Sequence, residues 1–332
     1  MRTNASAIGI GRKFAMGLAL SGTLTLLAAV PPVSAQDKVP EQCSMAIVTK
    51  QAVKSSKICD PKMVRELAKN GHVFEQNQLG IVSMLAIGPD YNPQQALQWF
   101  ERSARKGYAP AQVNLGVMYA NGWGTAPNLG AALRWFREAS DQGYARADYN
   151  LGVLYMQGRG VKKDYAEAMR YLRKGAEAGD SSAQTNLGYL YSEGLGVARD
   201  PKTAAIWYGK AAEAGDAMGE NDLADLYLRG EGVGQSDTEA FRLFQQAASK
   251  GETGARIKLG YMYSVGRGTQ KNIETACAWI TAATLAGDER GRDLLHSLEG
   301  QLSATQLANA RAQARKLNAE SEAQLSAKAL LP

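Results

Sequence analysis

The sequence contains few of the residues that most often carry out chemistry. Its 332 residues include two histidines, His72 and His296, and three cysteines. Neither histidine belongs to a recognisable metal-binding motif, and no nucleophile, base and acid stand together in a catalytic motif. We therefore expect no metal, no cofactor and no catalytic residue. We expect His72 to be solvated and His296 to be structural.

Long apolar runs are also scarce, and the one present lies near the N-terminus. Phe14–Val30 follows the basic pair Arg12-Lys13 and precedes Val33-Ser34-Ala35, a small-residue cleavage site. An uncleaved anchor is the alternative, but the run is shorter than the roughly 20 residues that span a bilayer. Residues 1–35 are thus predicted to be a signal peptide. The mature protein is expected to be periplasmic or secreted, with no stable membrane insertion.

An excess of charge of one sign is missing as well. The net charge is +6, and the three basic residues of the leader account for half of it. The remaining basic residues do not cluster on one segment, so the sequence predicts no nucleic-acid partner. The mature chain has no Asn-x-Ser/Thr sequon, which favours a bacterial periplasm over a eukaryotic lumen.

The cysteines fall into two groups. Cys43 and Cys59 lie together in the N-terminal segment, and export would place them where disulfides survive. A bridge between them is favoured over two free thiols, although their Cα atoms must come within about 7 Å. Cys277 occupies a repeated apolar register, which predicts a thiol in the core.

What the sequence has in abundance is internal repetition. Stepping by 36 residues returns to the same residue types in four registers, which is the signature of a solenoid. These registers are Leu79, Leu115, Leu151, Leu187, Leu223, Leu259 and Leu295; Gly71, Gly107, Gly143, Gly179, Gly215, Gly251 and Gly287; Trp99, Trp135, Tyr171, Trp207, Leu243 and Trp279; and Tyr119, Tyr155, Tyr191, Tyr227 and Tyr263.

Each period reads as a helix, a Gly-x-Gly loop, a second helix and a glycine turn. Apolar residues at i, i+4, i+7 and i+8 of the first helix form one face of a 3.6-residue period. The sequence therefore predicts an all-α fold, a right-handed α-α superhelix of two-helix repeats. The expected segments are an N-terminal segment with a capping helix (36–70), a degenerate first repeat (71–108), five repeats (109–288), C-terminal capping helices that end near Lys316 (289–318) and a flexible tail (319–332).

Two sets of glycines need separate explanations. Gly116, Gly152, Gly188 and Gly260 lie in mid-helix, where each costs about 1 kcal/mol relative to alanine, so a neighbouring helix is expected to lie too close for a Cβ. The Gly-x-Gly loops resemble phosphate cradles, but they recur in every repeat and do not follow a strand. Turns with positive φ explain them better.

The pattern Ala-x-x-x-Leu-Gly-x-x-Tyr-x-x-Gly-x-Gly, followed by Ala-x-x-Trp and a second glycine turn, resembles the Sel-one-like repeat family. The resemblance covers about Gly71 to Leu295. It implies a tetratricopeptide-like solenoid that acts mainly as an adaptor. A cysteine-rich branch of this family, described as penicillin-binding or weakly β-lactamase-like, carries a cysteine pair in each repeat. This chain lacks those pairs, so that activity is not inferred.

One face of the first helices is neither typical core nor typical surface. Its registers hold Val, Tyr and Met, and an adjacent register holds asparagines whose amides could bind a peptide backbone. This face either lines a concave groove or packs on the next repeat, and Trp123 either contacts a partner or folds over its own helix. The candidate partner-binding residues are Tyr149, Val153, Tyr189, Asn114, Asn150, Asn186 and Trp123.

Three functions follow as hypotheses. The favoured one is a periplasmic adaptor or regulator that binds a peptide or helix of another protein in the concave face. The second is a protein that binds or hydrolyses peptidoglycan or a β-lactam, for which Glu220, Asp222 and Asp225 are the nearest acidic cluster. The third is self-regulation, in which Ala329-Leu330-Leu331 occupies the groove until a partner displaces it.

Overall fold

A computed structural model describes residues 61–85 and 92–328. The predicted signal peptide, Cys43 and Cys59, and the terminal Ala329-Leu330-Leu331 lie outside the described residues. The described part consists of α-helices and one short 3-10 helix, without a strand. None of these helices is both long and apolar enough to cross a membrane.

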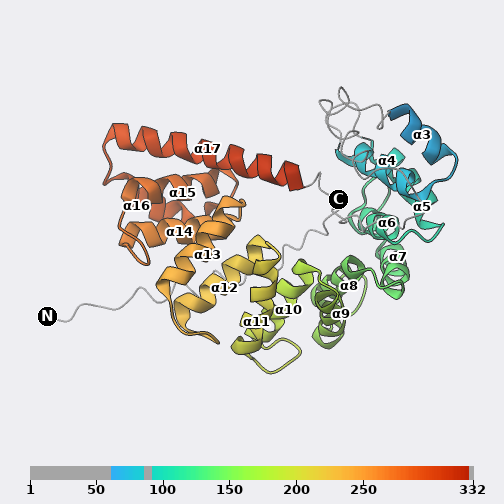
Figure 1. The fold of residues 1–332 in the computed structure, drawn as a ribbon, viewed down its shortest axis with the longest axis horizontal. Helices are drawn as coiled ribbons and strands as arrows, with labels where there is room; N and C mark the ends of the chain where they lie inside the picture. Colours follow the sequence, from blue (N-terminus) through green and yellow to red (C-terminus); the bar gives the residue numbers. More distant parts are fainter. Residues whose placement is uncertain (1–60, 86–91, 329–332) are drawn as a thin grey trace. The chain divides into compact units, whose positions relative to one another are not determined.

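The chain forms two compact units that divide after Asp180 (Figure 1). In unit 1 the helices follow one another as pairs, the first helix of each repeat packing on the second and the second on the next first helix. Its helices are α3 (Pro61–Lys69), α4 (Val73–Leu85), α5 (Pro93–Ala104), α6 (Ala109–Asn121), α7 (Leu129–Asp141), α8 (Ala145–Gln157) and α9 (Tyr165–Glu177).

Unit 2 continues the same alternation and ends in a long helix. The first and second helices pack as in unit 1, and the last helix lies along α15 and α13. The helices of unit 2 are α10 (Ser181–Glu193), α11 (Pro201–Glu213), α12 (Ala217–Arg229), α13 (Asp237–Ser249), α14 (Thr253–Val265), α15 (Ile273–Leu285), the 3-10 helix η4 (Glu289–Gly291), α16 (Arg292–Glu299) and α17 (Ala304–Lys328).

Local signals repeated every 36 residues set the helix ends. The first helices α6, α8, α12 and α14 each end at a glycine in the left-handed region, such as Gly122 with φ 72°. Each second helix begins at a residue whose side chain accepts a hydrogen bond from the first turn of the helix. These N-caps are Asn92, Asn128, Asp164, Asp200, Ser236 and Asn272.

The mid-helix glycines mark the closest helix contacts, as the sequence predicts. A Cβ built on Gly116 would lie 2.5 Å from the Phe136 ring, and one on Gly152 would lie 2.5 Å from Leu172. The loop glycines also serve packing, because a Cβ on Gly124 would collide with the backbone of Pro93 at the start of α5. The explanation by architecture, and not by phosphate binding, is therefore supported.

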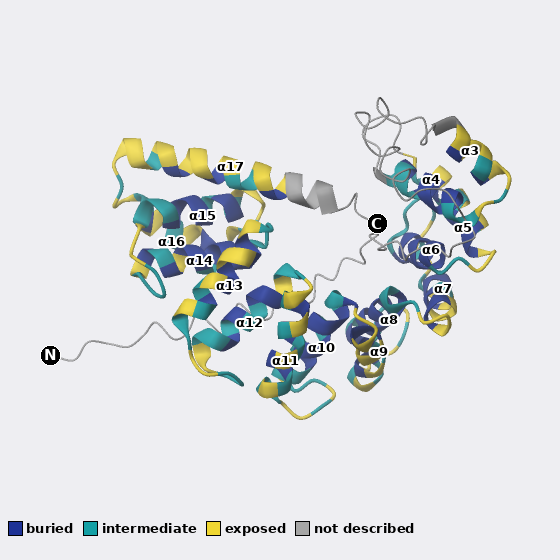
Figure 2. Cartoon of the chain, in the orientation of Figure 1, coloured by how far each residue is buried: buried dark blue, intermediate teal, exposed yellow. Residues whose placement is uncertain are grey.

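The core of each unit lies between its stacked helices, where the buried residues gather (Figure 2). Cys277 is fully buried on α15 within an apolar cluster, which confirms the prediction of a core thiol, and burial raises its pKa to about 11. Both histidines are exposed. The structural role expected for His296 is thus wrong, because it lies on the outer side of the short helix α16.

A buried polar register runs through the repeats beside the apolar core. Two of its members donate from their side-chain amides to backbone carbonyls: Gln76 to Ala68 and Gln112 to Ala104. The acidic members pair with lysines of the following second helix or its C-cap, Asp148 with Lys174 and Glu220 with Lys250. The members of this polar register are Gln76, Gln112, Asp148, Gln184, Glu220 and Arg256.

Arg256 is the last member of this polar register. Its contacts explain why the C-terminal helix is longer than predicted. Its guanidinium is fully buried and donates to the side chains of Asn318 and Ser321 on α17, and to Leu317 O. The helix expected to end near Lys316 therefore continues to Lys328, and the first ten residues of the expected flexible tail are helical. The physical reason is that α17 supplies hydrogen-bond acceptors to the buried guanidinium.

Candidate interaction surface

The asparagine side chains predicted to bind a peptide are not freely exposed. Asn114 is fully buried on α6 and donates through Nδ2 to Asn77 Oδ1 at 3.0 Å. Asn150 is also fully buried, and its amide makes no hydrogen bond in the structure. Asn186 is half-buried and donates to Ser182 O at 2.9 Å. A partner could reach Asn114 and Asn150 only after a local opening of the helices.

The registers predicted to hold exposed Val and Tyr residues are also partly buried. Tyr149 is 8% exposed, with the Arg146 guanidinium 5.2 Å from its ring centroid, and Val153 is also buried. Tyr189 is half-buried. The equivalent face of α6, formed by Val113 and Val117, packs in one apolar cluster with residues of α8, which is the packing alternative. These two registers therefore lie in the interior over most of unit 1.

Trp123 lies at a seam between repeats. The ring is half-buried and packs against the apolar clusters on both sides, one around Phe100 and one around Phe136. Its backbone N–H donates to Met118 O at 3.0 Å, which closes the turn after α6. The alternative that Trp123 folds over its own helix describes this position. Part of the ring still faces solvent.

Further along the same register, side chains on one face of α14 in unit 2 are exposed. Tyr261 and Val265 on α14 are 44% and 52% exposed. Tyr261 occupies the 36-residue register of Val117, Val153 and Tyr189. We call this face of α12 and α14 the inner stripe and define it as Asp222, Asp225, Lys258, Tyr261 and Val265. The sequence pattern contained Tyr261, but nothing in it indicated which repeats would leave this register exposed.

Charges of the inner stripe are linked across the two helices. Lys258 Nζ lies 2.6 Å from Asp225 Oδ2 and donates to Asn221 Oδ1 at 2.9 Å. Burial raises the pKa of Asp222 to about 7; the positive charge of Lys258 opposes this shift and the negative charge of Asp225 adds to it. The stripe therefore combines apolar side chains with one carboxyl group that titrates near neutrality.

The acidic cluster considered for an enzyme does not form one site. Glu220 is buried and paired with Lys250, whereas Asp222 and Asp225 belong to the inner stripe on another face of α12. Among the described residues, no group of three or more His, Cys, Asp or Glu side chains is placed to hold a metal ion. The inner stripe is a surface with charged and apolar parts.

The fold and this surface define an all-α repeat scaffold of the protein-interaction type. The Sel1 repeat profile matches residues 76–108, 109–144, 145–180, 181–216, 217–252 and 254–288, and the chain belongs to the Sel1 repeat family. The fold of this family is generally one of protein–protein interaction. No curated protein matches the chain.

Among the solved structures that resemble the chain are two Sel1-repeat proteins. A protective antigen of uropathogenic Escherichia coli strains with an SLR fold is 30% identical, with a TM-score of 0.62, and the match covers 81% of this chain and 57% of that one. This chain thus spans little more than half of that protein. A Sel1 repeat protein from Oxalobacter formigenes is 29% identical, with a TM-score of 0.62, over 68% of this chain and all of that chain.

Proposed function

We propose that this protein is a periplasmic adaptor that binds a peptide or helix of a protein partner on the inner stripe. The observation that carries the proposal is the exposure of Tyr261 and Val265, side by side with linked charges, on a fold generally used for protein interaction. A ring with a polar tip and an aliphatic side chain supply the contact area that interface centres use. The lysine and the carboxylates supply polar contacts at its rim.

The test is capture of the partner from envelope extracts with the mature protein as bait. Tyr261→Ser combined with Val265→Ser should abolish capture of a partner that the wild-type bait retains. Ile206→Ser is the matched control, because Ile206 is 58% exposed on the second helix α11 and lies outside the inner stripe. Capture that survives in the double variant, or is lost equally in the control, would refute the inner stripe as the binding surface.

The residues proposed from the sequence are tested in the same assay. Tyr149→Ala with Tyr189→Ala should lower stability, because Tyr149 is buried. We expect this variant to retain the partner at temperatures where it remains folded. Loss of the partner with an unchanged melting temperature would instead assign binding to Tyr149 and Tyr189.

The location in the periplasm is part of the proposal. Its support is the basic, apolar and small-residue succession of residues 1–35. Mass spectrometry of the protein recovered from a periplasmic fraction should give a mature chain that begins at Gln36. A protein that keeps Met1, or that stays with the cytoplasmic fraction, would contradict export.

A further inference from the structure

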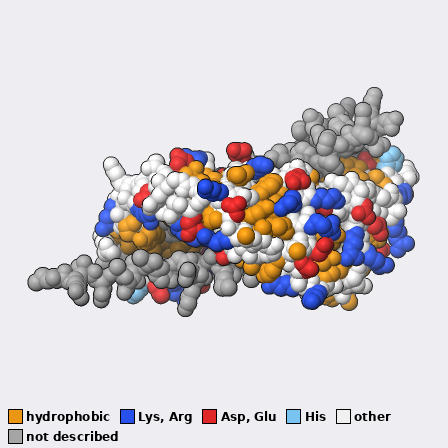
Figure 3. Space-filling model, turned by 90° about the horizontal axis from the view of Figure 1, so that it is seen from below, with side chains coloured by type: hydrophobic (Ala, Val, Ile, Leu, Met, Phe, Trp, Pro, Cys, Tyr) orange, Lys and Arg blue, Asp and Glu red, His pale blue; other side chains and the backbone are white. Residues whose placement is uncertain are grey.

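A second surface, on unit 1, joins arginines to aromatic rings. We call it the cation–aromatic strip and define it as Tyr119, Arg134, Arg137, Tyr155, Arg170 and Tyr171. The tyrosines are half-buried, whereas the three arginines are exposed. Lys and Arg side chains lie among hydrophobic and acidic ones over unit 1 in Figure 3. The strip shares no residue with the inner stripe.

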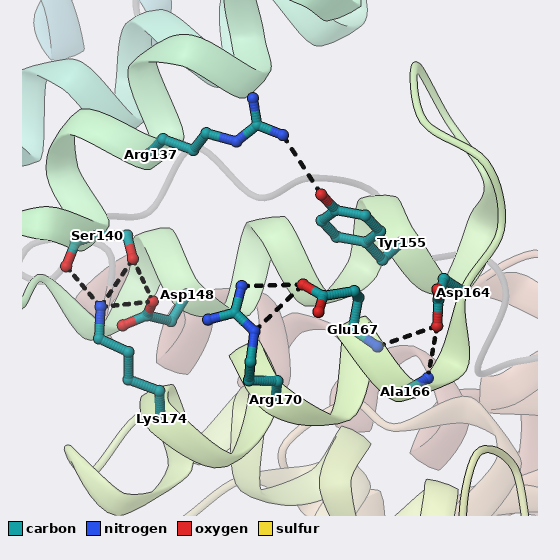
Figure 4. A network of polar contacts seen from close by, with 9 residues as sticks. All are labelled: Arg137, Ser140, Asp148, Tyr155, Asp164, Ala166, Glu167, Arg170 and Lys174. Atoms are coloured by element: carbon teal, nitrogen blue, oxygen red, sulfur yellow. Dashed lines mark hydrogen bonds and ion pairs between the residues drawn. The ribbon is translucent and has the colours of Figure 1, made fainter.

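Tyrosine rings hold two of the three arginines, Arg137 and Arg170, in place. Arg137 Nη2 donates to Tyr155 OH at 3.3 Å, and the Tyr155 ring stacks on Tyr171 with centroids 5.6 Å apart and planes at 15°. Arg170 lies 4.1 Å from the centroid of Tyr171 (Figure 4 shows Arg137, Tyr155 and Arg170). Guanidinium groups held over rings lose less freedom on binding than unsupported ones, and their N–H edges stay available.

The positive charge of the strip is largely uncompensated. Arg170 pairs with Glu167 at 2.9 Å, but neither Arg134 nor Arg137 has an ion-pair partner in the part of the chain that the structure describes. Arg134 acts electrostatically on Tyr119, whose hydroxyl donates to Glu101 at 2.9 Å. Among the described residues, no carboxylate lies within ion-pair distance of these two exposed guanidinium groups, which stand at i and i+3 on α7.

The first repeat of unit 2 lacks the two arginines of α7. Two repeats after Arg134 and Arg137, the positions hold Ile206 and Gly209. In that repeat the Trp207 ring, which occupies the register of Tyr171, has Lys210 Nζ 4.2 Å from its centroid. The combination of two arginines with stacked tyrosines is therefore not repeated in α10 and α11, although a cation over an aromatic ring is.

From this arrangement we propose that the cation–aromatic strip binds an acidic segment of a protein, rich in aspartate or glutamate. Carboxylates match the planar fork of arginine and form paired charge-assisted hydrogen bonds. Single-stranded nucleic acid fits less well, because the Tyr171 ring, on which a base would stack, already contacts Tyr155 and Arg170. This surface goes beyond the proposed function, since it shares no residue with the inner stripe.

The probe is a fluorescein-labelled oligoglutamate peptide, and the readout is fluorescence anisotropy with the mature full-length protein at low salt. Arg134→Glu with Arg137→Glu should weaken binding at least about tenfold, since hydrogen bonds between charged groups are lost. Arg242→Glu is the control, an exposed arginine of α13 in unit 2, and should change affinity less than about twofold. Circular dichroism verifies that each variant is folded.

Two further arms make the result specific. Tyr155→Leu with Tyr171→Leu keeps every charge and should still weaken binding several-fold, because the guanidinium supports are gone. The Tyr261→Ser, Val265→Ser variant should bind the peptide as the wild type does, so failure of this proposal and of the proposed function are distinguishable. Equal loss in the Arg242→Glu control, tighter binding of a single-stranded oligonucleotide of equal charge, or no binding of the peptide would overturn the proposal.

Discussion

Gly116 shows how a single residue determines the spacing of a repeat. A glycine in mid-helix is unfavourable by itself, yet here the missing side chain lets Phe136 of the paired helix pack against the backbone. The gain from close packing outweighs the propensity penalty at this position. At Gly209 in α11 nothing lies within 4 Å of the missing Cβ, so only the penalty remains.

These two glycines give opposite predictions for the same substitution. Gly116→Ala should destabilise by about 1–3 kcal/mol, because the new Cβ forces Phe136 out of place. Gly209→Ala should stabilise by up to about 1 kcal/mol through helix propensity. Urea unfolding followed by circular dichroism measures both. A neutral or stabilising Gly116→Ala would show that the helices separate easily at this point.

Asp222 makes stability depend on pH in the direction opposite to most carboxylates. Its pKa is about 7 in the folded protein, against about 3.9 unfolded. Between these values the folded state holds a proton that the unfolded state releases, so the free energy of unfolding should fall as pH rises from about 4 to 7. Asp222→Asn should flatten this part of the profile and stabilise by about 1–3 kcal/mol at pH 8.

The control for this profile is Asp200, the N-cap of α11. Hydrogen bonds from Thr203 lower its pKa, so its contribution is present at neutral pH and disappears only in acid. Asp200→Asn should leave the profile between pH 5 and 8 unchanged. Urea midpoints measured across that range decide the assignment, and an unaltered slope in Asp222→Asn would contradict it.

At the scale of the helix, α17 replaces the repeat that would otherwise follow. It covers α15, contributes Ala310 to the cluster around Cys277 and accepts the hydrogen bonds of Arg256. A buried guanidinium without partners is strongly unfavourable, so helix and arginine depend on each other. The docking of α17 therefore determines where the solenoid ends.

Arg256→Ala should loosen α17 and expose the thiol of Cys277. We expect a loss of about 2–4 kcal/mol and alkylation of Cys277 by iodoacetamide under native conditions, whereas the wild-type thiol is protected by burial and its raised pKa. Peptide mapping distinguishes Cys277 from the other cysteines. Arg292→Ala, which removes an exposed ion pair with Glu289, should leave Cys277 protected.

The helix pairs could be predicted from the sequence, whereas their mutual burial could not. The period, the helix pairs and the close contact at Gly116 follow from local spacing, and the structure confirms them. The burial of Tyr149 and Asn150 does not follow, because helix periodicity does not tell which face meets the next repeat. The length of α17 does not follow either, since its partner Arg256 lies more than 60 residues earlier in the chain.

At the scale of the whole molecule, the contacts are almost all between neighbours in the chain. Within each unit most helices pack on the one before and the one after, and α17 packs mainly on α15. Stability in such arrays is a sum of repeat and nearest-neighbour terms, so a local change spreads only a short way. Most of the surface is therefore energetically independent of any one repeat.

Hydrogen exchange tests this independence. Arg256→Ala should speed amide exchange in α14 to α17 and leave α5, α6 and α7 as in the wild type. Gly116→Ala should show the reverse distribution, with faster exchange in α6 and α7 and none in α15. Uniform acceleration throughout the protein in either variant would mean that the solenoid opens as one cooperative block.

The buried polar register has a consequence for how such a chain can evolve. Gln112 accepts from the Gln142 amide, Asp148 pairs with Lys174, and Glu220 pairs with Lys250, so in these three repeats the buried polar residue and its partner belong to the same repeat. Duplicating or exchanging a single helix would leave a buried charged side chain without its ion-pair partner. Duplications or exchanges that keep the protein stable must therefore involve whole two-helix repeats, in which the buried residue and its partner stay together.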